Sequence, residues 1–255
     1  MYSFFLQKGK NYKSYKTETN EKLLCILTFI IIVVSILPRV TLQITSMAFK
    51  APFTAIVSGS SQSGKSSLVE KIISYIDELI SPVPTKILYC YGAITNSLLR
   101  MKQKYGEEYF ILNRGFPSLE LMSSLSNALL ILDDLLVELD ENHKEMNMLF
   151  TKGSHHNNIS VIFLTQNLYD KRLRVPRINS HYLLLLKNPQ GRDQIRTLAQ
   201  QLYPEHRKFF QEAYDDATIQ PYSYLLIDLH PRTEEEKRLL TNIFPNEKRI
   251  YYIPI

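Results

Sequence analysis

The sequence predicts an α/β fold with a central, mostly parallel sheet flanked by helices, and three observations support this prediction. Residues 59–66 read GSSQSGKS, the pattern Gly-x-x-x-x-Gly-Lys-Ser of a loop that cradles phosphate groups. The apolar run at 53–57, directly before this loop, is typical of a strand buried in a parallel sheet. From residue 47 onward, short apolar runs alternate with helical patterns, as in repeated βαβ units.

The other elements are expected in the following order along the chain. Residues 66–80 carry apolar side chains on one helical face, and the sequence SPVP at 81–84 ends that helix. Further strands are predicted at 86–91, 109–112, 128–132, 160–165, 181–186 and finally 222–228. Further helices are predicted at 96–104, at 117–125 with Pro117 at its start, and at 138–150. With 255 residues, the chain has room for one such domain at 47–255, preceded by an extension at 1–46.

The phosphate loop indicates a nucleoside triphosphate as ligand. Gly59 and Gly64 let the backbone curl so that successive N–H groups point at a phosphate, and the following helix adds its positive N-terminal end. Lys65 is expected to reach the β- and γ-phosphates of ATP, and the Ser66 hydroxyl to hold Mg²⁺. The predicted nucleotide-binding residues are Gly59, Ser60, Ser61, Gln62, Ser63, Gly64, Lys65, Ser66 and Ser67.

An acidic strand end supplies the second half of an ATPase site. The run NALLILDD at 127–134 has the pattern of a buried strand that ends in two carboxylates next to a phosphate loop. Asp133 is expected to act on Mg²⁺ and Asp134 to polarise the attacking water. Enzymes with an extra strand between the two site strands usually carry the longer Glu at the second position, so the shorter Asp bears on the efficiency of hydrolysis rather than on nucleotide binding. If Asp134 is not the base, Glu138 is the next candidate.

A third predicted strand end contributes an amide and, beyond it, positive charge. The run SVIFLTQ at 160–166 places Gln166 where a sensor of the γ-phosphate is expected, because an amide both donates and accepts hydrogen bonds. The polar segment 151–158 ahead of this strand favours a loop or helix end near a subunit boundary. Lys152 within it is a candidate for a charge that acts on a neighbouring subunit's γ-phosphate.

A basic cluster follows the predicted sensor strand, with Pro176 expected to prevent a continuous helix through it. Its members are Lys171, Arg172, Arg174 and Arg177. Two interpretations are open: a solvated basic loop, or contacts to the phosphate backbone of double-stranded DNA, which need point charges and no fixed sequence.

Charge and cysteine content restrict the chain's environment only weakly. The net charge is +5, but residues 1–46 hold six Lys or Arg against two Glu, which leaves 24 against 23 for residues 47–255. The predicted domain is therefore nearly neutral, and the overall charge says little about partners. The two cysteines, Cys25 and Cys90, lie in apolar runs, so neither a disulfide framework nor a zinc site is predicted, and a reducing compartment fits.

The N-terminal extension contains fifteen uncharged residues at 23–37 (LLCILTFIIIVVSIL) that are too apolar for a solvated loop. Several interpretations stay open: a gene-model artefact or dispensable segment, a membrane anchor lengthened by the apolar residues at 40–47, a buried helix, or a signal peptide. Because a phosphate loop needs ATP, we expect an intracellular, nuclear or cytoplasmic location, with the membrane as a second option.

Together these motifs resemble the genome-packaging ATPases of the FtsK-HerA superfamily, in particular those of Polinton/Maverick elements and related adintovirus-like or virophage-like DNA viruses. The similarity covers nearly everything from residue 47 to about residue 252. Besides the loop and the acidic strand end, it includes KGSHHNNISVIFLTQNLY (152–169), NSHYLLLLKNPQGRDQIRTLAQQLYP (179–204) and EAYDDATIQPYSYLLIDLHP (212–231). Residues 1–46 have no counterpart in that family.

The resemblance implies a RecA-like P-loop NTPase core of the ASCE type, with the acidic strand adjacent to the loop strand. It further implies a homo-oligomeric ring that hydrolyses ATP with Mg²⁺ and pumps double-stranded DNA into a capsid through capsid or portal partners. Alternatives remain: a membrane-associated nucleotide-dependent switch or scaffold, an inactive relic that still binds ATP, or a small-molecule kinase.

Overall fold

The computed structural model describes residues 48–153 and 158–254, of which the side chains of 152 and 153 are excluded. The extension 1–46 and its apolar segment 23–37 lie outside these residues, so the interpretations of both stay predictions. Within the described ranges, no helix combines the length and the apolar character needed to cross a membrane.

A nine-stranded sheet organises the chain, in the order β11-β10-β9-β8-β2-β7-β6-β4-β5. The strands are β2 (Thr54–Ser58), β4 (Lys86–Tyr91), β5 (Phe110–Arg114), β6 (Ala128–Asp133), β7 (Ile159–Thr165), β8 (Tyr182–Leu186), β9 (Tyr224–Asp228), β10 (Leu239–Thr241) and β11 (Ile250–Tyr252). The pairs from β5 across to β8 are all parallel, whereas β9, β10 and β11 are added as antiparallel neighbours. A separate two-stranded parallel sheet joins β1 (Phe49–Lys50) to β3 (Ile80–Ser81). The predicted α/β, RecA-like P-loop fold is confirmed.

One implication of the family resemblance is wrong: the acidic strand is not adjacent to the loop strand. β7 lies between β2 and β6 and pairs with both in parallel. Consequently the three strands that carry the predicted site residues are consecutive in the order β2-β7-β6. Because parallel strands end at the same edge of a sheet, their polar C-terminal residues meet there.

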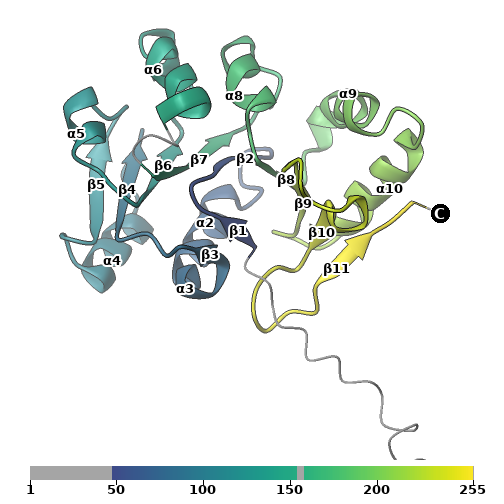
Figure 1. Cartoon of the computed structure of the whole chain (residues 1–255), viewed down its shortest axis with the longest axis horizontal. Coiled ribbons are helices and arrows are strands. Elements are labelled where there is room, and N and C mark those ends of the chain that lie inside the picture. The colour runs from purple at the N-terminus through teal and green to yellow at the C-terminus, as the bar shows by residue number, and fades with distance from the viewer. Residues whose placement is uncertain (1–47, 154–157, 255) are drawn as a thin grey trace, which may run out of the picture. The chain divides into compact units, whose positions relative to one another are not determined.

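Helices cover both faces of the sheet (Figure 1). The helices are α2 (Lys65–Ser74), α3 (Ile76–Leu79), α4 (Asn96–Tyr105), α5 (Leu119–Ser123), α6 (His143–Met148), α8 (Arg174–Ile178), α9 (Arg192–Leu202) and α10 (Arg207–Ala217). Short 3-10 turns lie at η1 (Glu138–Asp140), η3 (Lys171–Leu173), η4 (Pro189–Gly191) and η5 (Glu235–Lys237), and a π-helical turn at η2 (Leu149–Gly153). Helices α2, α3 and α4 pack on one face and the others on the opposite face, each through its own apolar cluster.

Side chains alternate between these two clusters because successive residues of a strand point to opposite faces. In β6, Leu130 and Leu132 join one cluster, whereas Leu129 and Ile131 join the other. Since both faces are covered, all four side chains are fully buried, which explains why β6 reads as a continuous apolar run.

Several predicted boundaries need correction. The helix expected at 66–80 consists of α2 and α3, with Tyr75 in a non-helical conformation between them and Ile80 already in β3. The helix expected at 138–150 is divided among η1, α6 and η2. The strand expected to be the last is followed by β10 and β11, whose three-residue lengths give too little alternation to detect.

Candidate functional site

The phosphate loop leaves β2 and closes against neighbouring segments that leave no room for side chains at its two glycines. The Gly59 N–H donates to the Thr165 carbonyl oxygen of β7 at 3.2 Å. A Cβ atom built at Gly59 lies 2.6 Å from Ser63 Oγ, and one built at Gly64 lies 2.5 Å from Tyr222 Cδ1. Gly64 also has a φ of 98°, a conformation that disfavours other residues. Both glycines are therefore required for this loop geometry.

Lys65, the first residue of α2, folds back over its own loop. Its Nζ donates to the carbonyl oxygens of Gly59 and Ser60, each at 2.9 Å. Burial lowers the pKa of the Lys65 ammonium, and the nearby carboxylates of Asp133 and Asp134 oppose that shift. The three N–H donors of this ammonium therefore lie close to the phosphate loop and near the carboxylates of Asp133 and Asp134.

A buried hydroxyl inside the loop bears on whether the loop fits a phosphate. Ser63 Oγ is buried and has no hydrogen-bond partner among the described residues. An unpaired buried hydroxyl costs free energy, so it marks a place where a ligand oxygen is favoured. Combined with the two glycines, this observation fits the triphosphate of ATP, whose oxygens accept hydrogen bonds.

Asp133, at the C-terminal end of β6, accepts two hydrogen bonds on one oxygen. Ser66 Oγ donates to Asp133 Oδ2 at 2.8 Å, and the Tyr89 hydroxyl donates to the same atom at 2.7 Å. Burial, followed by the Asp133 charge, raises the pKa of Tyr89 well above its usual value, which keeps the phenol protonated. A hydroxyl and a carboxylate that converge in this way are oxygen ligands suited to Mg²⁺, with Tyr89 orienting the carboxylate.

Tyr89 is a site residue that the sequence reasoning missed. It lies inside the predicted strand 86–91, now β4, for which no site residue was predicted. Its partner across the sheet is Ile131 of β6, two residues before Asp133. Only the parallel pairing of β4 with β6 reveals this role, because no local pattern distinguishes Tyr89 from Tyr91 in the sequence.

Asp134 follows β6 in a left-handed conformation, with a φ of 57°. Such a φ is uncommon for residues other than Gly but is tolerated by Asp and Asn. The neighbouring Gly92 permits this turn, since a Cβ built there lies 2.6 Å from the Asp134 carbonyl oxygen. The turn leaves the Asp134 side chain exposed on the cavity rather than packed under it.

One cavity of about 530 Å³ collects the predicted site residues from three strands. Its lining includes Lys65, Ser66, Asp133, Asp134 and Gln166. Gln166 is exposed and follows β7, so the predicted sensor, the acidic pair and the phosphate loop meet at one edge of the sheet. The alternative base, Glu138, does not line this cavity.

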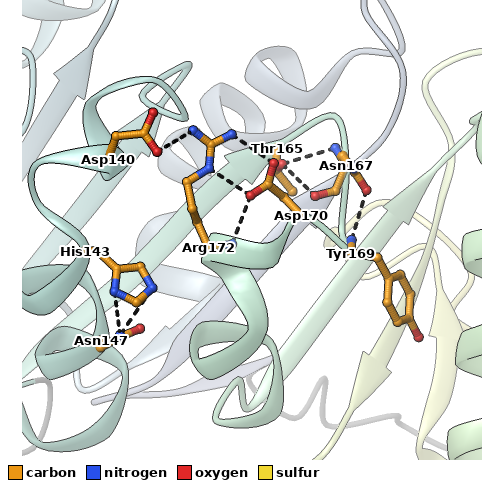
Figure 2. Close-up of polar contacts among 8 residues, drawn as sticks. All are labelled: Asp140, His143, Asn147, Thr165, Asn167, Tyr169, Asp170 and Arg172. Carbon is orange, nitrogen blue, oxygen red and sulfur yellow. Dashed lines mark hydrogen bonds and ion pairs between the residues drawn. The ribbon is translucent and has the colours of Figure 1, made fainter.

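Beyond Gln166, a polar network holds the segment after β7 (Figure 2). Thr165 Oγ1 donates to the Asn167 carbonyl oxygen at 3.2 Å, and the Tyr169 N–H donates to Asn167 Oδ1 at 3.0 Å. Arg172 then donates to both carboxylate oxygens of Asp170, at 2.8 and 2.9 Å, and to Asp140 Oδ1 at 3.1 Å. Arg172 therefore ties the segment after the sensor strand to the turn after the acidic strand.

The four residues of the basic cluster lie in two kinds of environment: two contact other side chains, and two are exposed. Arg172 has the carboxylate partners just described, and Arg177 lies 3.9 Å from the centre of the Tyr169 ring and donates to Gln201 Oε1. Lys171 and Arg174 are exposed. No single α-helix runs through the cluster, which is divided between the 3-10 turn η3 and the five-residue α8. Pro176 is the third residue of α8, where its missing N–H has no acceptor within the helix.

The candidate trans-acting residue, Lys152, lies in the π-helical turn η2. Its side chain lies outside the described residues, so this assignment stays a prediction.

Arg172→Ala should lower the free energy of unfolding by about 2 kcal/mol, because it leaves the largely buried Asp170 carboxylate without its charged donors. The hydrogen bonds from Arg172 hold the pKa of Asp170 below its usual value. This contribution is therefore present above the unfolded pKa of about 3.9 and is lost as pH falls through the lower folded pKa. Denaturant unfolding of the parent protein and the variant at pH 7 and at a series of pH values below about 4 checks both parts.

The exposed Arg174 provides the matched control for this substitution. Arg174→Ala removes the same charge from the same segment and should change stability by less than about 0.5 kcal/mol. Equal destabilisation by both substitutions would contradict the assignment of Arg172 as the structural member of the cluster.

No protein-family profile matches this sequence, and no curated protein matches it. Among solved structures, the chain is similar to the genome-packaging NTPase of Sulfolobus turreted icosahedral virus 2 in complex with AMPPCP, at 12% identity over 80% of this chain and 98% of that chain, with a TM-score of 0.43. It is also similar to a KaiC-like protein from Pyrococcus horikoshii, at 13% identity over 80% of this chain and 91% of that chain, with a TM-score of 0.44. A third similar structure is the cytoplasmic domain of EssC, at 14% identity over 76% of this chain and 39% of that chain, with a TM-score of 0.43. At TM-scores this low, these similarities carry no argument about function.

Proposed function

We propose that this chain is an ATPase, and specifically the motor subunit of a ring that translocates double-stranded DNA. The observation that carries the ATPase part is the hydrogen bond between Ser66 and Asp133 at the edge of a cavity that Lys65, Asp134 and Gln166 also line. Phosphate binding, cation binding and water activation each have a suitable side chain there.

Each residue then has one role in hydrolysis. Lys65 exchanges its loop carbonyl partners for the β- and γ-phosphate oxygens, and the loop N–H groups hold the β-phosphate. Ser66 and Asp133 would hold Mg²⁺, which would supply charge neutralisation on the phosphates. Asp134, exposed on the cavity, orients and deprotonates the attacking water, and Gln166 positions the γ-phosphate.

The DNA-translocating part of the proposal is supported by the family resemblance and by two exposed cations. The stretches at 152–169, 179–204 and 212–231 resemble those of the Polinton/Maverick packaging ATPases. Lys171 and Arg174 are exposed and form the remaining candidates for contacts to the DNA backbone. In a ring, each site lies at a boundary between subunits, which is the place proposed for Lys152. Capsid or portal proteins would be the further partners, at an intracellular, nuclear or cytoplasmic assembly site.

The test is steady-state ATP hydrolysis by the full chain, with and without linear double-stranded DNA, over a series of protein concentrations. A DNA-translocating ring should show specific activity that rises with protein concentration and rises again with DNA. Lys171→Ala combined with Arg174→Ala should reduce the DNA stimulation while leaving basal turnover unchanged. Turnover that is insensitive to both variables contradicts the motor and favours the switch or kinase alternatives, and nucleotide binding without turnover favours the relic.

A further inference from the structure

Two cavities flank the phosphate loop, and the proposed function uses only one of them. The second has a volume of about 300 Å³ and lies against Ser60, Ser63 and the loop at 219–222. Ser61 and Gln62 line both cavities, so these two residues separate them. A triphosphate held in the loop therefore has the cavity of Asp133 on one side and this second cavity on the other.

The second cavity contains an exposed aromatic side chain that lies directly on the phosphate loop. Tyr222 is 66% exposed, yet its ring edge approaches Gly64 so closely that a Cβ there would lie 2.5 Å from Tyr222 Cδ1. The backbone of Tyr222 has a φ of 64°, a costly conformation for a bulky residue. An exposed aromatic residue held in a strained conformation next to a ligand loop indicates a binding role rather than a packing role.

The rest of the motif around Tyr222 has structural partners. The Tyr224 hydroxyl is buried and accepts from the Ile243 N–H at 3.1 Å. Asp228 accepts from the His230 N–H at 2.9 Å and from Thr233 Oγ1 at 2.9 Å. The distinctive stretch PYSYLLID at 221–228 therefore combines residues that build β9 and its end with one aromatic residue directed at the loop.

The lining of the second cavity suits a flat aromatic ligand. Ile219, 65% exposed, and Pro221 provide apolar surface beside the Tyr222 ring. The opposite wall is fixed, because Ser60 Oγ donates to the Lys187 carbonyl oxygen at 3.1 Å. Every nucleobase has a π face, so any of the bases can stack on an aromatic side chain, whatever hydrogen-bond donors and acceptors it carries.

We propose that this cavity is the nucleobase subsite and that the base of the bound nucleotide stacks on Tyr222. The inference rests on the proposed function, because it requires the triphosphate to lie in the phosphate loop. The γ-phosphate then faces Asp133 and Gln166, and the base lies on the opposite side of Ser61 and Gln62. Affinity for ATP consequently has two separable parts, one from the loop and one from Tyr222.

A single-residue reporter tests this arrangement in the full chain. The sequence contains no tryptophan, so Tyr222→Trp introduces the only one, with an aromatic ring in the same place. ATP should change the tryptophan fluorescence strongly by stacking, whereas inorganic tripolyphosphate, which has no base, should bind and leave it nearly unchanged. ATP binding measured by calorimetry without a fluorescence change would overturn the inference.

Affinity measurements on two further variants separate stacking from loop support. Tyr222→Asn keeps a residue type that tolerates positive φ, and should weaken ATP binding about tenfold or more while leaving tripolyphosphate binding unchanged. Tyr222→Phe keeps the ring and should bind ATP as the parent protein does. If Tyr222→Asn lowered the affinities for ATP and for tripolyphosphate equally, the inference would be overturned. Tyr222 would then act by holding the phosphate loop at Gly64 rather than by stacking on the base. If the parent protein binds neither ligand, the proposed function itself fails.

Discussion

Lys65→Ala should reduce the affinity for ATP by about 100-fold or more and abolish turnover. The substitution removes the only side-chain ammonium among the described residues lining the cavity that also holds Asp133 and Asp134. Charge-assisted hydrogen bonds contribute about 1.5–3 kcal/mol each, and about 1.4 kcal/mol corresponds to a tenfold change in affinity. Binding of ATP and of tripolyphosphate should both be lost, since the lysine contacts phosphates. Isothermal calorimetry on the full chain measures both.

The control for this variant must show that the loop still folds, because Lys65 also bonds to the carbonyl oxygens of Gly59 and Ser60. Lys71→Ala is the matched control, since Lys71 lies on the same helix α2 but its side chain does not contact the loop. Its Nζ forms an ion pair with Glu247 Oε1 at a distance of 2.6 Å. It should leave ATP affinity unchanged, and thermal unfolding should place both variants within a few degrees of the parent protein. A Lys65→Ala protein that is equally stable and binds ATP within a fewfold of the parent would refute the site.

Asp134→Asn should leave ATP affinity nearly unchanged and reduce turnover by about 10²–10⁴-fold, the range expected when a general base is removed. Asn is the closest replacement in shape, and it tolerates the φ of 57° that Asp134 adopts after β6. The backbone turn and the Ser66 contact to Asp133 should therefore be preserved. Steady-state hydrolysis combined with equilibrium nucleotide binding separates the two effects.

Two comparisons make the assignment of Asp134 specific. Glu138→Gln should retain turnover, because Glu138 in η1 does not line the cavity. Asp133→Asn should lower turnover together with the apparent affinity for Mg²⁺, because Asp133 is the carboxylate bonded to Ser66. Turnover that survives in Asp134→Asn but is lost in Glu138→Gln would move the base to Glu138.

The parts of the fold that could be predicted from the sequence are those where the local pattern and the tertiary environment agree. The parallel strands β2, β6 and β7 are buried on both faces and read as uninterrupted apolar runs. Their ends were predicted within about a residue, as expected where polar side chains must begin once the sheet ends. The antiparallel strands β10 and β11, with three residues each, carry no such signal.

Helix boundaries depended more on tertiary contacts. Residues 66–80 show continuous helical periodicity, but Tyr75 breaks the helix, and its ring lies 5.8 Å from that of Phe244. Ile80 pairs with Phe49, which lies far away in the sequence, and so becomes part of a strand. Long-range packing of this kind outweighs helix propensity, which amounts to less than about 1 kcal/mol per residue.

The phosphate loop, the acidic pair and the predicted sensor could be recognised from the amino-acid sequence, because each depends on residue types at fixed short spacing next to a buried strand. Features that depend on pairing between distant segments became visible in the three-dimensional structure alone. In the folded chain, β7 lies between β2 and β6, and the Tyr89 hydroxyl donates a hydrogen bond to Asp133. Arg172 donates to Asp170 and Asp140. The Tyr222 ring packs against Gly64. The physical reason is that local periodicity reports which face of an element is buried, whereas the identity of the neighbour on that face follows from the order of strands in the sheet.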